Sequence, residues 1–194
     1  MSRALNVEAY QSVLRQAGVA FAAGLRDEEL EAIEQRDRFV FPPDLRAFLG
    51  AALPVSHGFV DWRALDDTAM AAYLESPFEG IAFDIESNAF WLPEWGLRPD
   101  ALTDAIAVAR SAFDAAPRLI PICGHRFIPD RPREAGNPVF SVHQTDIILY
   151  GADLAQYLEN EFSPHFGTPR YQIRDDARVI DFWSRMVDVN NGAG

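Results

Sequence analysis

The chain has 194 residues, of which 48% are hydrophobic and 12% aromatic; this is typical of a globular protein with one sizeable core and excludes a disordered chain. Its 17 basic and 29 acidic side chains give a formal net charge of −12. That balance argues against broad binding to a nucleic-acid backbone and favours association with a basic partner. The single cysteine, Cys123, allows no disulfide within the chain and is typical of a reducing compartment.

The amino-terminal residues MSRALNVEAYQ lack the basic and apolar regions of a secretion signal. No apolar run approaches the roughly 20 residues of a membrane helix. We therefore expect a cytoplasmic location and no membrane partner.

The first part of the chain is predicted to be helical. Apolar residues recur at helical spacing within residues 5–17, and acidic residues open a second helix within 24–38, where they favour the positive end of the helix dipole. A third helix begins near Pro43, which fits a first turn, and ends at Pro54. A fourth follows residues 56–63, with Asp61 as its expected N-cap.

The side chains within residues 80–87 alternate in character, which predicts a strand. Ile81, Phe83 and Ile85 would lie on one face, and the carboxylates of Asp84 and Glu86 on the other. A loop carrying Phe90, Trp91 and Trp95 comes next. Residues 100–116 then predict a helix, because apolar residues recur at i, i+4, i+7 and i+11 and Asp100 can cap its start.

Residues 117–162 hold three apolar runs and a helical pattern. The runs 119–123, 139–143 and 146–150 predict strands, the last two joined by a short turn at Gln144 and Thr145. Residues 127–138 contain three prolines and predict an ordered surface loop. Asp153 is placed to cap a helix that runs to Phe162. Beyond it, only residues 179–189 predict a short helix.

Several segments carry a family resemblance: FPPDLRAFL at 41–49, GFVDWR at 58–63, FDIESNAFWLPEWGLRP at 83–99, and most of 117–162. Their order and number closely resemble the bacterial branch of the SUKH superfamily, the Smi–Knr type, over about residues 24–162. The resemblance implies a single α+β domain with a mixed, largely antiparallel sheet of about four to six strands packed with helices. Residues 1–23 would be an N-terminal helical segment, and residues 163–194 an extension of the same domain with a short helix.

Many bacterial members of that superfamily are inferred to be immunity proteins that neutralise a cognate toxin, often a nuclease. The resemblance therefore implies a non-enzymatic protein-binding domain without a cofactor, whose partner is a protein such as a basic toxin domain. Fungal relatives are scaffolding regulators of cell-wall synthesis, so an intracellular scaffold or regulator is the second reading. The superfamily has no agreed active site, and no catalytic residue is carried over.

The candidate partner-binding residues combine acidic groups, which suit a basic partner, with the Trp and Arg side chains that dominate interface hot spots. They are Asp84, Glu86, Trp91, Glu94, Trp95, His125, Arg126 and Arg131. For Trp91 and Trp95 a place in the core stays equally open.

A metal-dependent or small-molecule enzyme is the third reading. Asp84 and Glu86 could hold a hard cation or divide acid and base roles, and His125, His143 and Asp146 could form a ligand cluster with Asp84. Their spacing matches no zinc signature. A Cys123–His125 pair would need an exposed thiolate, whereas the run around Cys123 predicts burial. The chain lacks the Gly-x-Ser-x-Gly elbow and the common phosphate loops. We therefore predict neither a catalytic nor a metal site.

Overall fold

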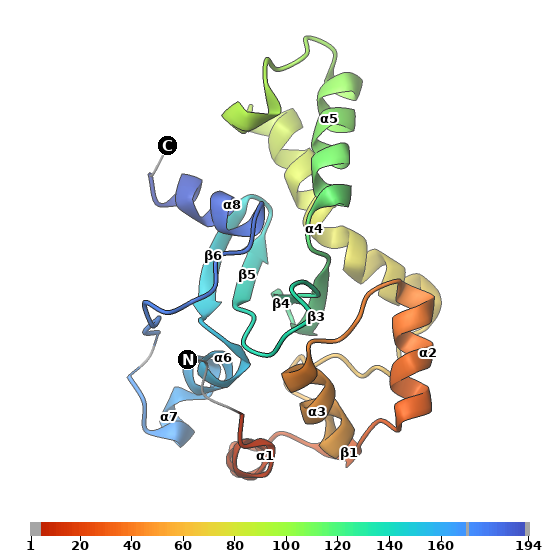
Figure 1. Ribbon diagram of the computed structural model, residues 1–194, viewed down its shortest axis with the longest axis vertical. Coiled ribbons are helices and arrows are strands. Elements are labelled where there is room, and N and C mark those ends of the chain that lie inside the picture. The colour runs from red at the N-terminus through yellow and green to blue at the C-terminus, as the bar shows by residue number, and fades with distance from the viewer. Residues whose placement is uncertain (1–4, 170, 193–194) are drawn as a thin grey trace.

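The computed structural model describes residues 5–169 and 171–192, with helices on both sides of a central sheet (Figure 1). The helices are α1 (Val7–Gln16), α2 (Asp27–Asp37), α3 (Pro43–Ala51), α4 (Asp67–Ser87), α5 (Leu102–Ala115), α6 (Leu154–Glu161), α7 (Ser163–Phe166) and α8 (Trp183–Asn190), with a 3₁₀ turn, η1, at Pro93–Trp95. The strands are β1 (Phe21–Ala23), β2 (Ala52–Pro54), β3 (Leu119–Cys123), β4 (Arg126–Pro129), β5 (Val139–His143) and β6 (Asp146–Gly151).

The four-stranded sheet, in the order β3-β4-β5-β6, separates two hydrophobic cores. Ile120 and Ile128 belong to the first core, with side chains of α1, α2, α3 and α6. Phe127 and Phe140 belong to the second, with side chains of α4, α5 and α8. Because successive side chains of a strand point to opposite faces, both faces of this sheet are buried.

The predicted fold class, a single α+β domain, is confirmed. The predicted sheet is not mixed, however: all the described strand pairs are antiparallel, and the six strands form one sheet of four and one of two. The hairpin of β5 and β6 turns at Gln144 and Thr145 as predicted, with Gln144 in the left-handed region at φ 56°.

The strand predicted at residues 80–87 is wrong, because these residues form the end of α4. Ile81 and Ile85 are buried, which fits either a strand or a helix, since both patterns place i and i+4 on one side. Phe83 decides between them. A strand would bury it beside the two isoleucines, yet its side chain is 48% exposed.

Helix α4 accommodates a proline and a close contact with the sheet. Pro77 has no N–H to donate to the carbonyl of Tyr73, and the hydroxyl of Ser76 donates to that carbonyl instead at 2.8 Å. One turn later, a Cβ on Gly80 would lie 2.6 Å from Cα of Gln144. Glycine is therefore required where α4 touches the β5–β6 turn.

The loop predicted at residues 127–138 is partly wrong, since residues 126–129 form β4. The amide of Asp130 donates to the carbonyl of Arg118 on the β3 side at 2.8 Å. Because amide directions alternate along a strand, Pro129 would direct its missing N–H toward β5. The pairing with β5 covers only Arg126 and Phe127, so Pro129 removes no ladder hydrogen bond.

Three local predictions near helix ends are also wrong. Asp66, rather than Asp61, caps α4, and Asp61 instead accepts from the amides of Arg63 and Ala64 within a turn. Ala101, rather than Asp100, is the N-cap of α5. Helix α3 ends at Ala51, before Pro54, because residues 52–54 pair with β1 in a small sheet that the sequence pattern did not predict.

The predicted C-terminal helix is present as α8, and Asp153 caps α6 as predicted. Helix α8 contacts β6, and the side chain of Asn190 at its end donates to the carbonyls of Thr145 and Ile147. The segment after Phe162 thus completes the second core. None of the described helices combines the length and apolar character needed to cross a membrane.

Candidate functional site

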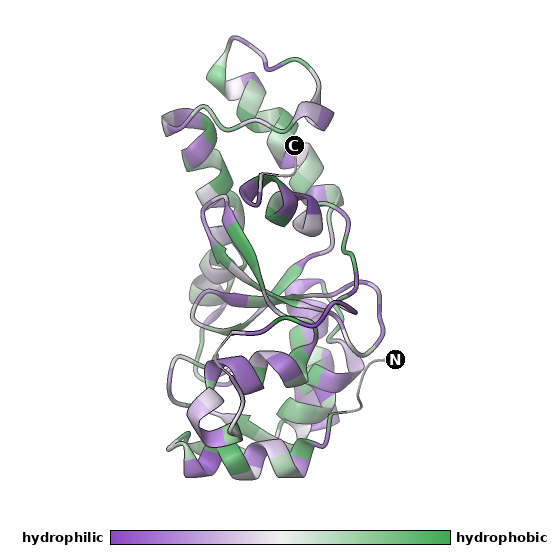
Figure 2. Cartoon of the chain, turned by 90° about the vertical axis from the view of Figure 1, so that its left-hand side faces the viewer, coloured by the Kyte–Doolittle hydropathy of each residue, from purple (hydrophilic) through white to green (hydrophobic). Residues whose placement is uncertain are grey.

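Helices α4 and α5 form a hairpin that projects beyond the central sheet at one end of the longest axis, opposite α1 (Figures 1 and 2). Five large apolar side chains are exposed among the described residues, and three of them lie on this hairpin. They are Phe83 in α4, Leu97 in the connecting loop and Leu102 at the start of α5, which are 48%, 98% and 36% exposed. We therefore take this hairpin as the candidate interaction site.

Carboxylates accompany these apolar side chains. Glu79 and Glu86 lie four residues before and three after Phe83, so all three side chains share one face of α4. Both glutamates are exposed. We call Glu79, Phe83, Glu86, Leu97 and Leu102 the hairpin surface. Its acidic and apolar character suits a partner that presents basic groups around an apolar pocket.

Asp84, in contrast, is a buried residue that links α4 to the sheet by hydrogen bonds. Its carboxylate accepts from the amide of Thr145 at 2.8 Å and from the hydroxyl of Thr145 at 2.7 Å, and also from the side-chain amide of Asn88. Burial alone would raise the pKa of Asp84, but these hydrogen bonds and the charge of His143 lower it below its ordinary value.

The expectation that the carboxylates of Asp84 and Glu86 lie on one face of a strand is wrong, because these residues belong to α4 and residues two apart on a helix point about 200° apart. Glu86 faces solvent while Asp84 faces the β5–β6 turn. The two carboxylates therefore do not form a joint site for a cation or for acid–base chemistry.

Trp91 and Trp95 are half-buried in an aromatic cluster rather than free on the surface. Trp95 contacts Phe90 and Trp91 edge-on and stacks on Phe182 with ring centroids 6.4 Å apart. The indole N–H of Trp91 donates to the carbonyl of Gly96 at 2.7 Å. These rings shape the loop that presents Leu97.

Glu94 belongs to the same loop, and its exposed side chain pairs with Arg185 of α8 at 3.1 Å. This ion pair joins the hairpin to α8. Glu94 therefore already has an ion-pair partner within the chain.

Arg126 is mostly buried on the first face of the sheet, where its guanidinium group has several internal partners. It donates to the hydroxyl of Ser141 at 2.8 Å, lies 3.3 Å from a carboxylate oxygen of Glu161, and covers the ring of Tyr150. Its side chain is 13% exposed. Little of the Arg126 side chain is therefore accessible to a partner.

His125 is exposed in the turn between β3 and β4, and it does not belong to the α4–α5 hairpin. Loss of hydration and the charge of Arg126 lower its pKa. Cys123 is buried and donates to the carbonyl of His57 at 3.2 Å, and burial raises the pKa of its thiol. A raised thiol pKa disfavours the thiolate that a nucleophile needs.

The structure brings His143 close enough to Asp84 for their charges to interact. Within residues 5–169 and 171–192, however, no group of three or more His, Cys, Asp or Glu side chains is arranged to hold a metal ion.

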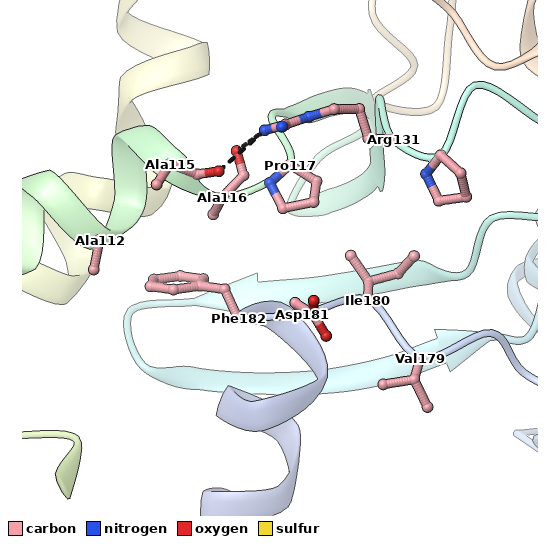
Figure 3. Close-up of a pocket in the computed structure, with 10 residues that line it drawn as sticks. Ala112, Ala115, Ala116, Pro117, Arg131, Val179, Ile180, Asp181 and Phe182 are labelled. Atoms are coloured by element: carbon pink, nitrogen blue, oxygen red, sulfur yellow. Dashed lines mark hydrogen bonds between the residues drawn. The ribbon is translucent and has the colours of Figure 1, made fainter. Parts of the chain in front are cut away.

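Arg131 lies apart from the other candidates, at the carboxyl end of α5. Its guanidinium group donates to the carbonyls of Ala115 and Ala116, which have no acceptor role within the helix (Figure 3). It also borders two cavities at this end of α5.

The eight predicted partner-binding residues therefore do not form one site. Glu86 alone belongs to the hairpin surface, with Trp91, Glu94 and Trp95 supporting the adjoining loop. The alternating pattern of residues 80–87 did not indicate Phe83 as a site residue, because it placed Phe83 on the buried face of a strand, and no local pattern indicated Leu97. A helical reading of residues 79–86 would have placed Phe83 between two glutamates.

In comparisons of this chain with family models, with curated proteins and with solved structures, no match was found. The resemblance to the SUKH superfamily therefore stays a prediction that depends on the sequence motifs.

Proposed function

We propose that this chain is a non-enzymatic protein-binding domain that uses the hairpin surface to bind a basic protein. The observation that carries the proposal is the exposure of Phe83 and Leu97 on a projecting hairpin that also bears exposed glutamates. With the SUKH resemblance, this supports an immunity protein whose partner is a basic toxin domain.

The apolar side chains would supply most of the affinity. Burying a Phe or Leu side chain in a partner's pocket is worth about 1.5–3 kcal/mol each. The glutamates and the net charge of −12 would act mainly on the rate of association. We therefore expect binding to weaken as salt concentration rises.

The combined Phe83→Ala and Leu97→Ala variant is expected to lose at least about 30-fold in affinity, corresponding to the roughly 2 kcal/mol of a hot spot. The full chain is used to capture its partner from lysate of its own organism, and the captured protein is then purified and titrated by calorimetry. Val179→Ala is the control, since Val179 is an apolar residue that is 75% exposed and does not belong to the hairpin surface. Thermal unfolding of each variant checks that the fold is kept.

Equal affinity of the double variant and the wild type would show that the hairpin surface is not the binding site. A partner without basic character, or no stoichiometric partner at all, would count against the proposal itself. To separate the immunity and regulator readings, the captured protein is expressed with and without this chain. Growth that stops without the chain and returns with it supports immunity, whereas a growth defect on deletion of the chain alone supports a regulator.

A further inference from the structure

A basic cavity lies in this acidic chain, at the carboxyl end of α5. All 17 basic side chains of the sequence are arginines. Four of them, Arg38, Arg118, Arg131 and Arg133, line one cavity of about 580 Å³. Two aspartates, Asp114 and Asp130, share this lining, so the charged groups of the cavity leave a net charge of +2.

Both aspartates already have partners. Asp130 is buried and accepts from the amide of Arg118 at 2.8 Å, with Arg131 Nε at 3.5 Å. Asp114 lies 3.6 Å from Arg110 on its own helix. Each carboxylate therefore has a partner within the chain.

The arginines differ in how far they are engaged. Arg118 donates to the carbonyl of Asp37, and Arg131 to the last carbonyls of α5. Arg38 and Arg133 are exposed, and within the described part of the chain neither has a carboxylate at ion-pair distance. Both residues line the cavity, and within the described part of the chain neither guanidinium group donates a hydrogen bond.

The position of Arg38 has a conformational cost. It follows α2 in the left-handed region at φ 58°, where glycine or asparagine is the usual residue. An arginine that adopts this backbone without a compensating ion pair is consistent with a role for its side chain at the cavity.

The carboxyl end of α5 opposes an anion, because a helix C-terminus carries roughly half a negative charge. Arg131 offsets this effect, since its guanidinium group donates to the carbonyls of Ala115 and Ala116 (Figure 3). The positive charge of Arg38 then remains for a ligand, together with that of Arg133, which also acts on the carboxylate of Asp130.

A second cavity, of about 540 Å³, adjoins the first and shares Ala116, Pro117 and Arg131 with it. Apart from Arg131 and Asp181 its lining residues are apolar, and the side chain of Ile180 and the ring of Phe182 lie on the side opposite the end of α5 (Figure 3). Volumes of this size are those of small-molecule sites.

We infer that the two cavities bind a phosphate-bearing small molecule of the nucleotide class. Its phosphates lie between Arg38 and Arg133, because guanidinium groups match phosphate oxygens in pairs of hydrogen bonds. Its ring lies in the apolar cavity beside Pro117 and Phe182. This site is separate from the hairpin surface and does not depend on the proposed function.

The test uses the full chain and calorimetric titration at low ionic strength with two probes, inorganic pyrophosphate and ADP. We expect both to bind, ADP about 5- to 10-fold more tightly because its ring adds apolar contact. The combined Arg38→Gln and Arg133→Gln variant is expected to bind both probes at least about tenfold more weakly. The control variant, Arg15→Gln with Arg26→Gln, carries the same change of net charge outside both cavities.

Equal weakening in both arginine variants, or no binding of pyrophosphate by the wild type, would overturn the phosphate site. Equal affinity of the wild type for pyrophosphate and ADP would overturn the placement of the ring. Because Arg38 and Arg133 are exposed and form no ion pair in the described residues, the melting temperature without ligand is expected to stay unchanged, so a loss of binding is not a loss of fold.

Discussion

Replacing Asp84 by alanine is expected to lower the free energy of unfolding by about 3 kcal/mol, since hydrogen bonds to a charged group contribute roughly 1.5–3 kcal/mol each. The buried carboxylate accepts two hydrogen bonds from Thr145 and one from Asn88. Without it, the amide of Thr145 loses its acceptor at the contact between α4 and the β5–β6 turn. Urea unfolding of the wild type and the variant measures the difference.

Glu86→Ala is the matched control, because Glu86 is a carboxylate two residues away on the solvent side of the same helix. Its effect is expected to stay within about 0.5 kcal/mol, as for most surface substitutions. Similar losses in both variants would contradict the helical placement of this segment and favour a shared role for the two carboxylates.

The contribution of Asp84 is also expected to depend on pH. The folded-state pKa of Asp84 is lowered below its ordinary value of 3.8, so between the two pKa values the unfolded chain binds more protons than the folded chain. Stability therefore rises with pH through this window. The difference in unfolding free energy between wild type and Asp84→Ala is expected to be constant from neutral pH to about pH 5 and to shrink as the pH falls through the folded-state pKa. A difference that grows on acidification would contradict this assignment.

Replacing Trp183 by alanine is expected to cost about 3–5 kcal/mol, the range for removing a large buried aromatic side chain. Trp183 is 1% exposed, packs edge-on against Phe113 and Phe182, and donates from its indole N–H to the carbonyl of Pro117 at 2.7 Å. It joins α8, α5 and the start of β3. Chemical denaturation, followed by the loss of far-ultraviolet circular dichroism, measures the change.

Trp183→Phe separates packing from hydrogen bonding at this position. It keeps an aromatic ring but leaves the carbonyl of Pro117 without its donor, so we expect a smaller loss of about 1–2 kcal/mol. If Trp183→Ala unfolded at the same denaturant concentration as the wild type, the C-terminal segment would be an appendage and not part of the second core.

The two proposed sites place different demands on the fold. The apolar side chains of the hairpin surface are exposed, so they can be changed with little effect on either core. The basic cavity lies where the end of α2, the end of α5 and the segment after β4 come together, so its shape depends on how these three pack. Variants of exposed residues can therefore test binding at each site separately from stability.

Local patterns were sufficient for elements whose signals depend on neighbouring residues alone. The amino-acid composition excluded a disordered chain. The helical spacing of apolar residues predicted the positions of most helices, and short apolar runs predicted β3, β5 and β6. The two-residue turn and the cap of α6 at Asp153 were also predictable, because each involves residues only a few positions apart.

Only the packed fold decided the rest, because the deciding contacts join residues far apart in the chain. The apolar pattern of residues 80–87 is compatible with a strand and with a helix. Only the packing of α4 against the second core, which leaves Phe83 exposed, distinguishes the two. Pro129 argued against a strand, but the ladder with β5 had already ended at Phe127. Asp84 accepts a hydrogen bond from Thr145, which is 61 residues away in the sequence. This contact gives Asp84 a structural role, although the sequence had indicated it as a candidate site residue. The arginines of the cavity, at positions 38, 118, 131 and 133, likewise came together only through the contact of α2, α5 and the β4 region.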